Sequence, residues 1–527
     1  MKLSRRKLMQ AALGATQVGL LSQFGMGRSA FAAPLKATKL LTIWIGGGCH
    51  WESFFAPFTS AGITKFMVPP TGGLTPHGYK PSQVENFDRS LVDLDQPGVK
   101  RKLRGPVYWN WANHSDAAGV LPSSGGSQNF RPWGYAWADP MYKIYERIAV
   151  LVGADQNTAA HTSGIVASMC GVAGATFRAP AIQAVVANAL ASRFPDRPLA
   201  NVSLGGINTT SLDLPSIAAP VRIGSPSSIE PTLSDKWDSS WLGLRARTME
   251  PGLKFDGSSQ SAAMPLTRVD AALLKATRGL KGKSSPGADA VLEQLYETYK
   301  GTSRTLARDV VAVLGQVKGF EHLKANAEYP INWSSCIGSA DSCGGSASMG
   351  PYDLALQLLK SNLVTSVSMN GSSFNNTQFD THSVGGPQFG ANHLRIAFEQ
   401  VARMLIEMQL TPGAAPGKTL LDETIVYVYS DFGRTFPRQG SDHHPATCAI
   451  LAGGSIIGNQ LVGGYDEAMN GSPLGVPVPL IEEGGQTETR PPRSQDVAAT
   501  VINAFGLEPG KDFFIPGGYG VFDGVIG

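Results

Sequence analysis

The chain has 527 residues, of which 42% are hydrophobic and only 16% are charged. This composition is too apolar for a disordered chain, and the sequence lacks the long apolar runs of a protein with many membrane spans. The formal net charge of +3 is far from the basic excess that nucleic-acid binding requires, so no nucleic-acid partner is expected. A large folded core is expected instead.

The N-terminus has the pattern of an export signal. Arg5 and Arg6 precede a weakly hydrophobic stretch over residues 11–24, and residues 30–32 (Ala-Phe-Ala) fit a signal-peptidase site. Paired arginines before such a stretch are typical of the twin-arginine pathway. We therefore expect a signal peptide over residues 1–32, recognition by the twin-arginine export machinery, a periplasmic or secreted protein, and no membrane span in the mature chain. Cleavage would change the formal charge from +3 to −2, because the signal contains five basic residues and no acid.

Four short apolar runs predict buried strands. The runs are continuous rather than alternating, which is what strands covered on both faces require. They span residues 40–45, 148–152, 363–369 and 424–429. Helical patterns with apolar residues at three- and four-residue spacing span residues 181–193, 288–314 and 394–408. This alternation predicts an α/β fold with a doubly wound, mainly parallel sheet and helices on both faces.

Two stretches depart from this alternation. Residues 104–142 contain four of the nine tryptophans among Gly, Ser and Pro. This fits a loop insertion held by its aromatic side chains or, alternatively, a tryptophan-lined surface that faces a carbohydrate substrate. Residues 261–327 are rich in helical pattern and predict a second, helical insertion. With both treated as insertions, residues 33–527 are expected to form a single domain.

The five cysteines predict neither a disulfide scaffold nor a zinc motif. Cys49, Cys170 and Cys448 fit no zinc-binding spacing, and they are expected to be buried small hydrophobes. Cys336 and Cys343 lie in a Gly/Ser-rich segment, where a small disulfide-closed loop is an open alternative in an oxidising compartment.

Polar residues that can bind metal ions follow each of the predicted strands. Ligands bind at the carboxyl ends of the strands in an open α/β sheet, so these side chains are expected to converge in one crevice. Asp and His suit Zn²⁺, Mn²⁺ or Mg²⁺, and two such ions can clamp both oxygens of an in-line phosphoryl transfer. The predicted metal ligands are His50, His161, Asp380, His382, Asp431 and His443. Arg434 follows the fourth strand and is expected either to bind an anionic oxygen or only to pair with Asp431.

The segment around these ligands resembles a known family. The similarity is to an exported bacterial family called domain of unknown function 1501 (DUF1501), which belongs to the alkaline phosphatase and sulfatase superfamily. It covers most of the mature chain and is most specific between Phe379 and Gly464. The similar motifs are residues 47–57 (the Gly-Gly segment), 380–382 (Asp-Thr-His), 430–435 (SDFGRT), 440–443 (GSDH), 453–454 and 463–464 (both Gly-Gly).

This resemblance implies an alkaline phosphatase-like fold with two metal ions. Asp380, His382 and His443 would occupy positions like those of one metal site, and Asp431 would belong to the second. The chain departs from the family pattern after the Gly-Gly pair, where Cys49 and then His50 stand in place of the usual Asp.

The resemblance also implies a nucleophile at the start of a helix. Phosphatases and sulfatases place a Ser, Thr or Cys there, about ten residues before a Gly, and counting back from Gly171 puts His161 at that position. A helix start near His161 presents free N–H groups to an anion. Three alternatives follow: Thr162 or Ser163 is the nucleophile, a metal-bound water attacks directly, or hydrolysis has been lost.

The sequence therefore predicts a periplasmic metal-dependent hydrolase of phosphate or sulfate esters. Its substrate would be a small anionic ester or a sulfated or phosphorylated glycan, and Arg434 would stabilise charge on the transferred group. The alternative is a non-catalytic exported metal-binding or assembly protein that uses the same fold as a scaffold.

Overall fold

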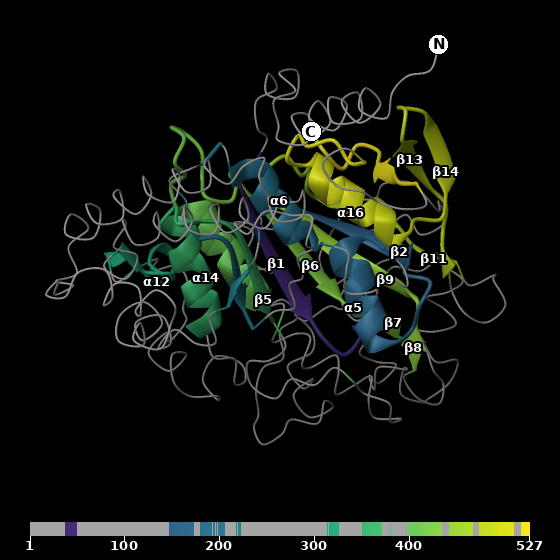
Figure 1. Ribbon diagram of the computed structural model, residues 1–527, viewed down its shortest axis with the longest axis horizontal. Coiled ribbons are helices and arrows are strands. Elements are labelled where there is room, and N and C mark those ends of the chain that lie inside the picture. The colour runs from purple at the N-terminus through teal and green to yellow at the C-terminus, as the bar shows by residue number, and fades with distance from the viewer. Residues whose placement is uncertain are drawn as a thin grey trace, which may run out of the picture.

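A computed structural model describes the central sheet, the helices that cover it and the C-terminal part of the chain (Figure 1). The expected signal peptide, the insertion over residues 104–142 and most of the helical insertion lie outside the described residues, as do Cys336 and Cys343. The described residues are 37–49, 147–172, 180–191, 193, 194, 197, 199–205, 218, 220–222, 313, 314, 316–325, 350–371, 380, 397, 400–434, 442–466, 474–510 and 518–527.

Eight strands form one mixed sheet in the order β10-β2-β9-β6-β1-β5-β3-β4. Strand β9 pairs antiparallel with β2 and β6, and the other five pairings are parallel. The sheet is therefore mainly parallel, which confirms the predicted α/β class. The strands are β1 (Lys39–Ile45), β2 (Ile148–Asp155), β3 (Leu199–Leu204), β4 (Val221–Arg222), β5 (Val364–Asn370), β6 (Thr424–Ser430), β9 (Ala446–Ala452) and β10 (Gln460–Gly463).

The central strands are buried on both faces, as their continuous apolar runs predict. Every residue of β5 and β6 is buried. Along β6, Val426 and Val428 join one apolar cluster, whereas Ile425 and Tyr427 join a second cluster. Successive side chains of a strand point to opposite faces, so the two clusters are the cores on the two sides of the sheet.

Helices cover both of these faces. Helices α5 (His161–Cys170), α6 (Ile182–Ala191) and α16 (Ser494–Asn503) contribute to the second cluster and lie together on one side of the sheet (Figure 1). Helices α12 (His322–Ala325) and α14 (Gly350–Lys360) contribute to the first cluster, together with a helical segment over residues 400–410. Helix α5 begins at His161, the residue at which the resemblance implied a helix start.

The remaining strands form small antiparallel sheets, and the described cysteines are buried. Cys49, Cys170 and Cys448 are free thiols within the core, as predicted. Among the described helices, none is long and apolar enough to cross a membrane. The small sheets pair β7 (Gly433–Arg434) with β8 (His443–His444), β11 (Tyr465–Asp466) with β12 (Leu474–Gly475), and β13 (Val478–Glu482) with both β14 (Thr487–Arg490) and β15 (Gly520–Phe522).

Lys39 at the start of β1 is a buried cation, and it makes the stability of the fold depend on pH. Burial, helped by the nearby charge of Arg197, lowers the pKa of Lys39 from 10.5 to about 8, although Glu423 lies 3.4 Å away and opposes the shift. Between these two values the unfolded chain binds more protons than the folded chain, so this lysine makes the free energy of unfolding rise with pH. Below this window both states are protonated, and the contribution is constant.

We therefore expect wild-type protein to gain stability relative to a Lys39→Met variant as the pH rises from 8 to 10. The gain should be at most about 1.4 kcal/mol per pH unit. Urea unfolding of both proteins at several pH values measures it. A stability difference that stays constant or reverses in this window would contradict the assigned burial cost.

Candidate metal centre

Asp431 follows the end of β6 and supplies the buried charge of the site. The residue is 1% exposed. Its Oδ1 accepts a hydrogen bond from Trp44 Nε1 at 2.5 Å, and its Oδ2 accepts one from the Gly47 backbone N–H at 2.9 Å. His161 Nδ1 lies 2.7 Å from the same Oδ2. Because an ionised carboxylate only accepts hydrogen bonds, the proton of this contact belongs to His161 Nδ1.

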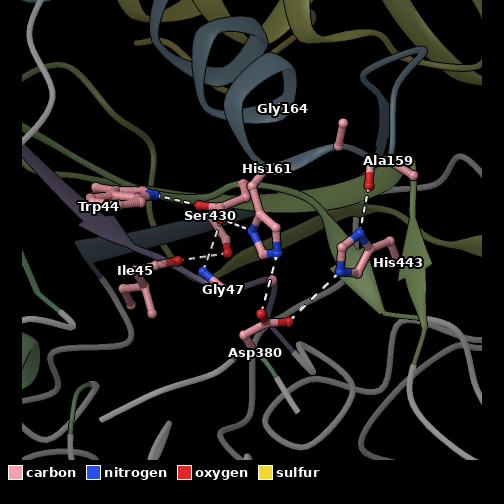
Figure 2. Close-up of polar contacts among 12 residues, drawn as sticks. Trp44, Ile45, Gly47, Ala159, His161, Gly164, Asp380, Ser430 and His443 are labelled. Atoms are coloured by element: carbon pink, nitrogen blue, oxygen red, sulfur yellow. Dashed lines mark hydrogen bonds and ion pairs between the residues drawn. The ribbon is translucent and has the colours of Figure 1, made fainter. Parts of the chain in front are cut away.

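His161 and His443 both direct their Nε2 atoms toward Asp380 (Figure 2). His161 Nε2 lies 3.5 Å from Asp380 Oδ2, and His443 Nε2 lies 3.7 Å from Asp380 Oδ1. His443 Nδ1 lies 2.7 Å from the carbonyl oxygen of Ala159, so this ring also carries a proton on Nδ1. Each imidazole is thereby oriented by its Nδ1 contact, and each presents Nε2 to the same carboxylate.

Helix α5 is pressed against the end of β6, and this contact places His161 at the site. Ser168 Oγ donates to the Ser430 carbonyl at 2.9 Å, and Tyr427 Oη donates to the Ser168 carbonyl at 2.9 Å. A Cβ atom on Gly164 would lie 2.2 Å from the Asp431 carbonyl oxygen. Only glycine therefore permits this approach, which brings the first turn of α5 to Asp431.

Arg434 lies beside Asp380, on the β7 strand that pairs with His443 of β8. Its side chain is fully buried; Nη2 donates to Asp380 Oδ1 at 2.8 Å and also to the Gly47 carbonyl. Nε donates to the Gly48 carbonyl at 3.4 Å. The guanidinium thus joins Asp380 to the loop after β1. The ion pair seen here is with Asp380, whereas one alternative from the sequence had paired Arg434 with Asp431.

The Phe432 ring packs between the polar groups. Its centroid lies 4.7 Å from that of His161 and 4.1 Å from that of His443. Gly48 has a φ of +82°, and a Cβ there would lie 2.3 Å from the Phe432 ring. Gly48 therefore has a left-handed backbone conformation and packs closely on Phe432, and a residue with a side chain would be unfavourable for both.

The hydrogen bond to Asp431 is the main influence on the charge of His161. This bond raises the pKa of His161 above its usual value of 6.5; partial burial opposes the shift, and the charge of Asp380 adds to it. In the metal-free protein the ring is therefore more easily protonated than a free histidine. A metal ion at Nε2 would compete with that second proton.

The structure brings together five of the residues singled out in the sequence. They are His161, Asp380, Asp431, Arg434 and His443. Thr162 is exposed and Ser163 half-exposed in the first turn of α5, beside His161. His50 and His382 lie outside the described residues.

Three groups that bond to Asp431 or to His443 were not among the predicted site residues: the Trp44 indole, the Gly47 amide and the Ala159 carbonyl. Two of them are backbone groups, for which residue type carries no signal. Trp44 was visible only as the aromatic residue near the end of a predicted strand.

The donor set fits a divalent cation. His161, Asp380 and His443 each offer one ligand atom, and these atoms all lie within 4.8 Å of one another. Two imidazoles and a carboxylate are the protein ligands of several catalytic zinc sites, and metal-binding histidines usually donate their other N–H to a carboxylate or a backbone carbonyl. Both histidines here have such a partner, so the cluster resembles a metal centre more than a chance group of charges.

Residues 359–519 match the family described as "Protein of unknown function (DUF1501)". The matched range includes Asp380, Asp431, Arg434 and His443, and it supports the resemblance inferred from the sequence. His161 lies outside this range, so its place in the site comes from the fold. No curated protein and no solved structure matched the chain.

The close contact between Gly164 and Asp431 makes this glycine sensitive to substitution. In a Gly164→Ala variant the added Cβ must push α5 away from β6, at a cost of about 1–3 kcal/mol. Urea unfolding measures the loss, and Ala189→Ser on α6 adds one atom at a half-exposed helical position as a matched control. Equal stability of the two variants would show that α5 does not depend on this approach.

Proposed function

We propose that the protein is a periplasmic metal-dependent hydrolase of phosphate or sulfate esters. The observation that carries the proposal is the pair of imidazoles, His161 and His443, that direct Nε2 toward Asp380 while their Nδ1 atoms are held by Asp431 and the Ala159 carbonyl. Such preorganised histidines are typical of metal centres, and metal centres are a common means of hydrolysing phosphate esters.

His161, Asp380 and His443 would hold the divalent ion. Imidazole ligands favour Zn²⁺ or Mn²⁺ over Mg²⁺, which prefers oxygen ligands. When bound, such an ion supplies Lewis-acid chemistry at the ester. The second ion implied by the resemblance, and the roles of His50 and His382 as ligands, remain part of the proposal.

The start of α5 favours a substrate with negative charge. The first turn of the helix contains no acidic residue of its own, and its positive end faces the site, where Asp431 and Asp380 contact the His161 ring. Thr162 and Ser163 lie in this turn and remain the proposed nucleophiles. The proposed substrate is an anionic ester, either small or part of a sulfated or phosphorylated glycan, bound next to His161.

The position of the site also supports an alkaline phosphatase-like architecture. Trp44 and Gly47 lie at or beyond the end of β1, His161 lies beyond β2, and Asp431 lies beyond β6. These three strands run in the same direction, so the site lies at the carboxyl edge of a mainly parallel sheet, where such folds bind ligands. Export by the twin-arginine pathway belongs to the same proposal and is supported by the N-terminal sequence.

A second candidate is a non-catalytic metal-binding or assembly protein. It is favoured by His161 at the first position of α5, where the resemblance implies a Ser, Thr or Cys nucleophile. In this case the metal centre would have a structural role, and the fold would serve as a scaffold.

Substitution of Asp380 separates these two functions. We expect Asp380→Asn to weaken Zn²⁺ or Mn²⁺ binding at least tenfold and to lower kcat/KM for an aryl phosphate or aryl sulfate about 100-fold or more, because one of the three ligands loses its charge. Residues 33–527 are purified, metal content is measured by mass spectrometry, and hydrolysis is followed with both esters. Asp523→Asn, the same substitution beyond β15, is the matched control and should change neither quantity.

Two results would contradict the hydrolase. Wild-type protein that binds the ion but hydrolyses no phosphate or sulfate ester across a substrate panel would favour the scaffold. Wild-type protein that takes up no divalent ion would exclude both functions.

A further inference from the structure

Both carboxylate oxygens of Asp431 already bind hydrogen-bond donors of the protein. Oδ1 accepts from Trp44 Nε1, and Oδ2 accepts from both the Gly47 amide and His161 Nδ1. These donors come from two separate elements, β1 with the loop that follows it and α5. A metal ion bound directly to Asp431 would have to compete with this network in a region where the carboxylate is almost completely buried.

Within the described part of the chain, the ring of His161 connects the Asp431 side chain to the predicted metal position. Nδ1 of this ring contacts Asp431, and Nε2, on the opposite side, contacts Asp380. Figure 2 shows the His161 ring directed at Asp380. The cluster of candidate ligand atoms contains Asp380, His161 and His443.

We infer that Asp431 is a positioning residue that holds His161 as the Nδ1–H tautomer with its Nε2 directed at the metal position, and that Asp431 does not bind the ion itself. This inference rests on the metal site of the proposed function and assigns Asp431 a different role from the one that the resemblance implies. Trp44 and Gly47 support the role, because Trp44 holds Oδ1 and Gly47 holds Oδ2, which fixes the carboxylate that contacts His161.

The protonation state of His161 tests the inference without any metal. Two-dimensional ¹H–¹⁵N spectra of the metal-free protein, recorded at a pH above the titration of the ring, distinguish the two neutral tautomers. Wild-type protein should show the Nδ1–H tautomer. In Asp431→Asn the side chain has one acceptor oxygen for three donors, so the Nε2–H form should gain population. Trp44→Phe removes one donor and keeps both oxygens, so His161 should stay in the Nδ1–H form.

Binding of Co²⁺ tests whether Asp431 acts as a ligand. We expect Asp431→Asn to lower Co²⁺ affinity about 10- to 100-fold, the usual effect of losing the partner of a metal-binding histidine, while the visible absorption bands of the bound ion keep their positions. His161→Ala should shift those bands because it removes a ligand. Asp422→Asn, at a half-buried aspartate bonded to Arg147 and Thr419, controls for lost stability and should leave Co²⁺ affinity unchanged.

Several results would overturn the inference. They are an Nε2–H tautomer in the wild-type protein, an unchanged tautomer in a folded Asp431→Asn variant, and loss of a bound Co²⁺ equivalent with a shift of its bands in that variant. The wild-type tautomer needs no substitution, so the inference stays testable if Asp431→Asn does not fold. Failure of ester hydrolysis with the expected tautomer and Co²⁺ results would contradict the proposed function and leave the role of Asp431 supported.

Discussion

The buried carboxylate of Asp431 is the constraint on which the site depends. A buried charge is costly unless hydrogen bonds compensate it, and here the compensation comes from the Trp44 indole, the Gly47 amide and the His161 ring. Those donors belong to segments far apart in the sequence. Satisfying one carboxylate therefore fixes the end of β6, the loop after β1 and the first residue of α5 relative to one another, and this arrangement also orients an imidazole.

Close packing makes that compensation possible. Gly164 lets α5 approach the Asp431 carbonyl, and Gly48 lets the loop after β1 pack on Phe432. Ser168 then bonds α5 to the last residue of β6. Larger residues at the two glycines would separate the same elements, so the polar network and the absence of side chains at these glycines are parts of one arrangement.

The sequence predicts the strands of the sheet better than the contacts at its edge. Strands β1, β2, β5 and β6 are continuous buried runs, and shared direction makes polar residues at their ends converge. Strands β3, β4, β9 and β10 were not among the predicted runs. In β3, Asn201 and Ser203 stand within the run; both are buried, and Asn201 donates to the Ala218 carbonyl. The residue types of β9 do not indicate that this strand runs antiparallel to its neighbours. The sequence also does not show which group forms a hydrogen bond with a given histidine. The partner of His443 is a backbone carbonyl, and the partner of His161 lies 270 positions away.

The charges of the described site fit the binding of a cation and an anion together. When both imidazoles are neutral, as metal ligands must be, the two negative charges of Asp380 and Asp431 and the positive charge of Arg434 leave a formal balance of −1 within the described residues. This balance would favour a divalent cation, and binding one would make the balance positive. The positive end of α5, with no acidic residue in its first turn, then lies next to a cationic centre. Arg434, bonded to Asp380, also keeps this carboxylate from repelling an anion with its full charge. In the proposed function, the same groups would therefore first bind the ion and then favour an anionic ester.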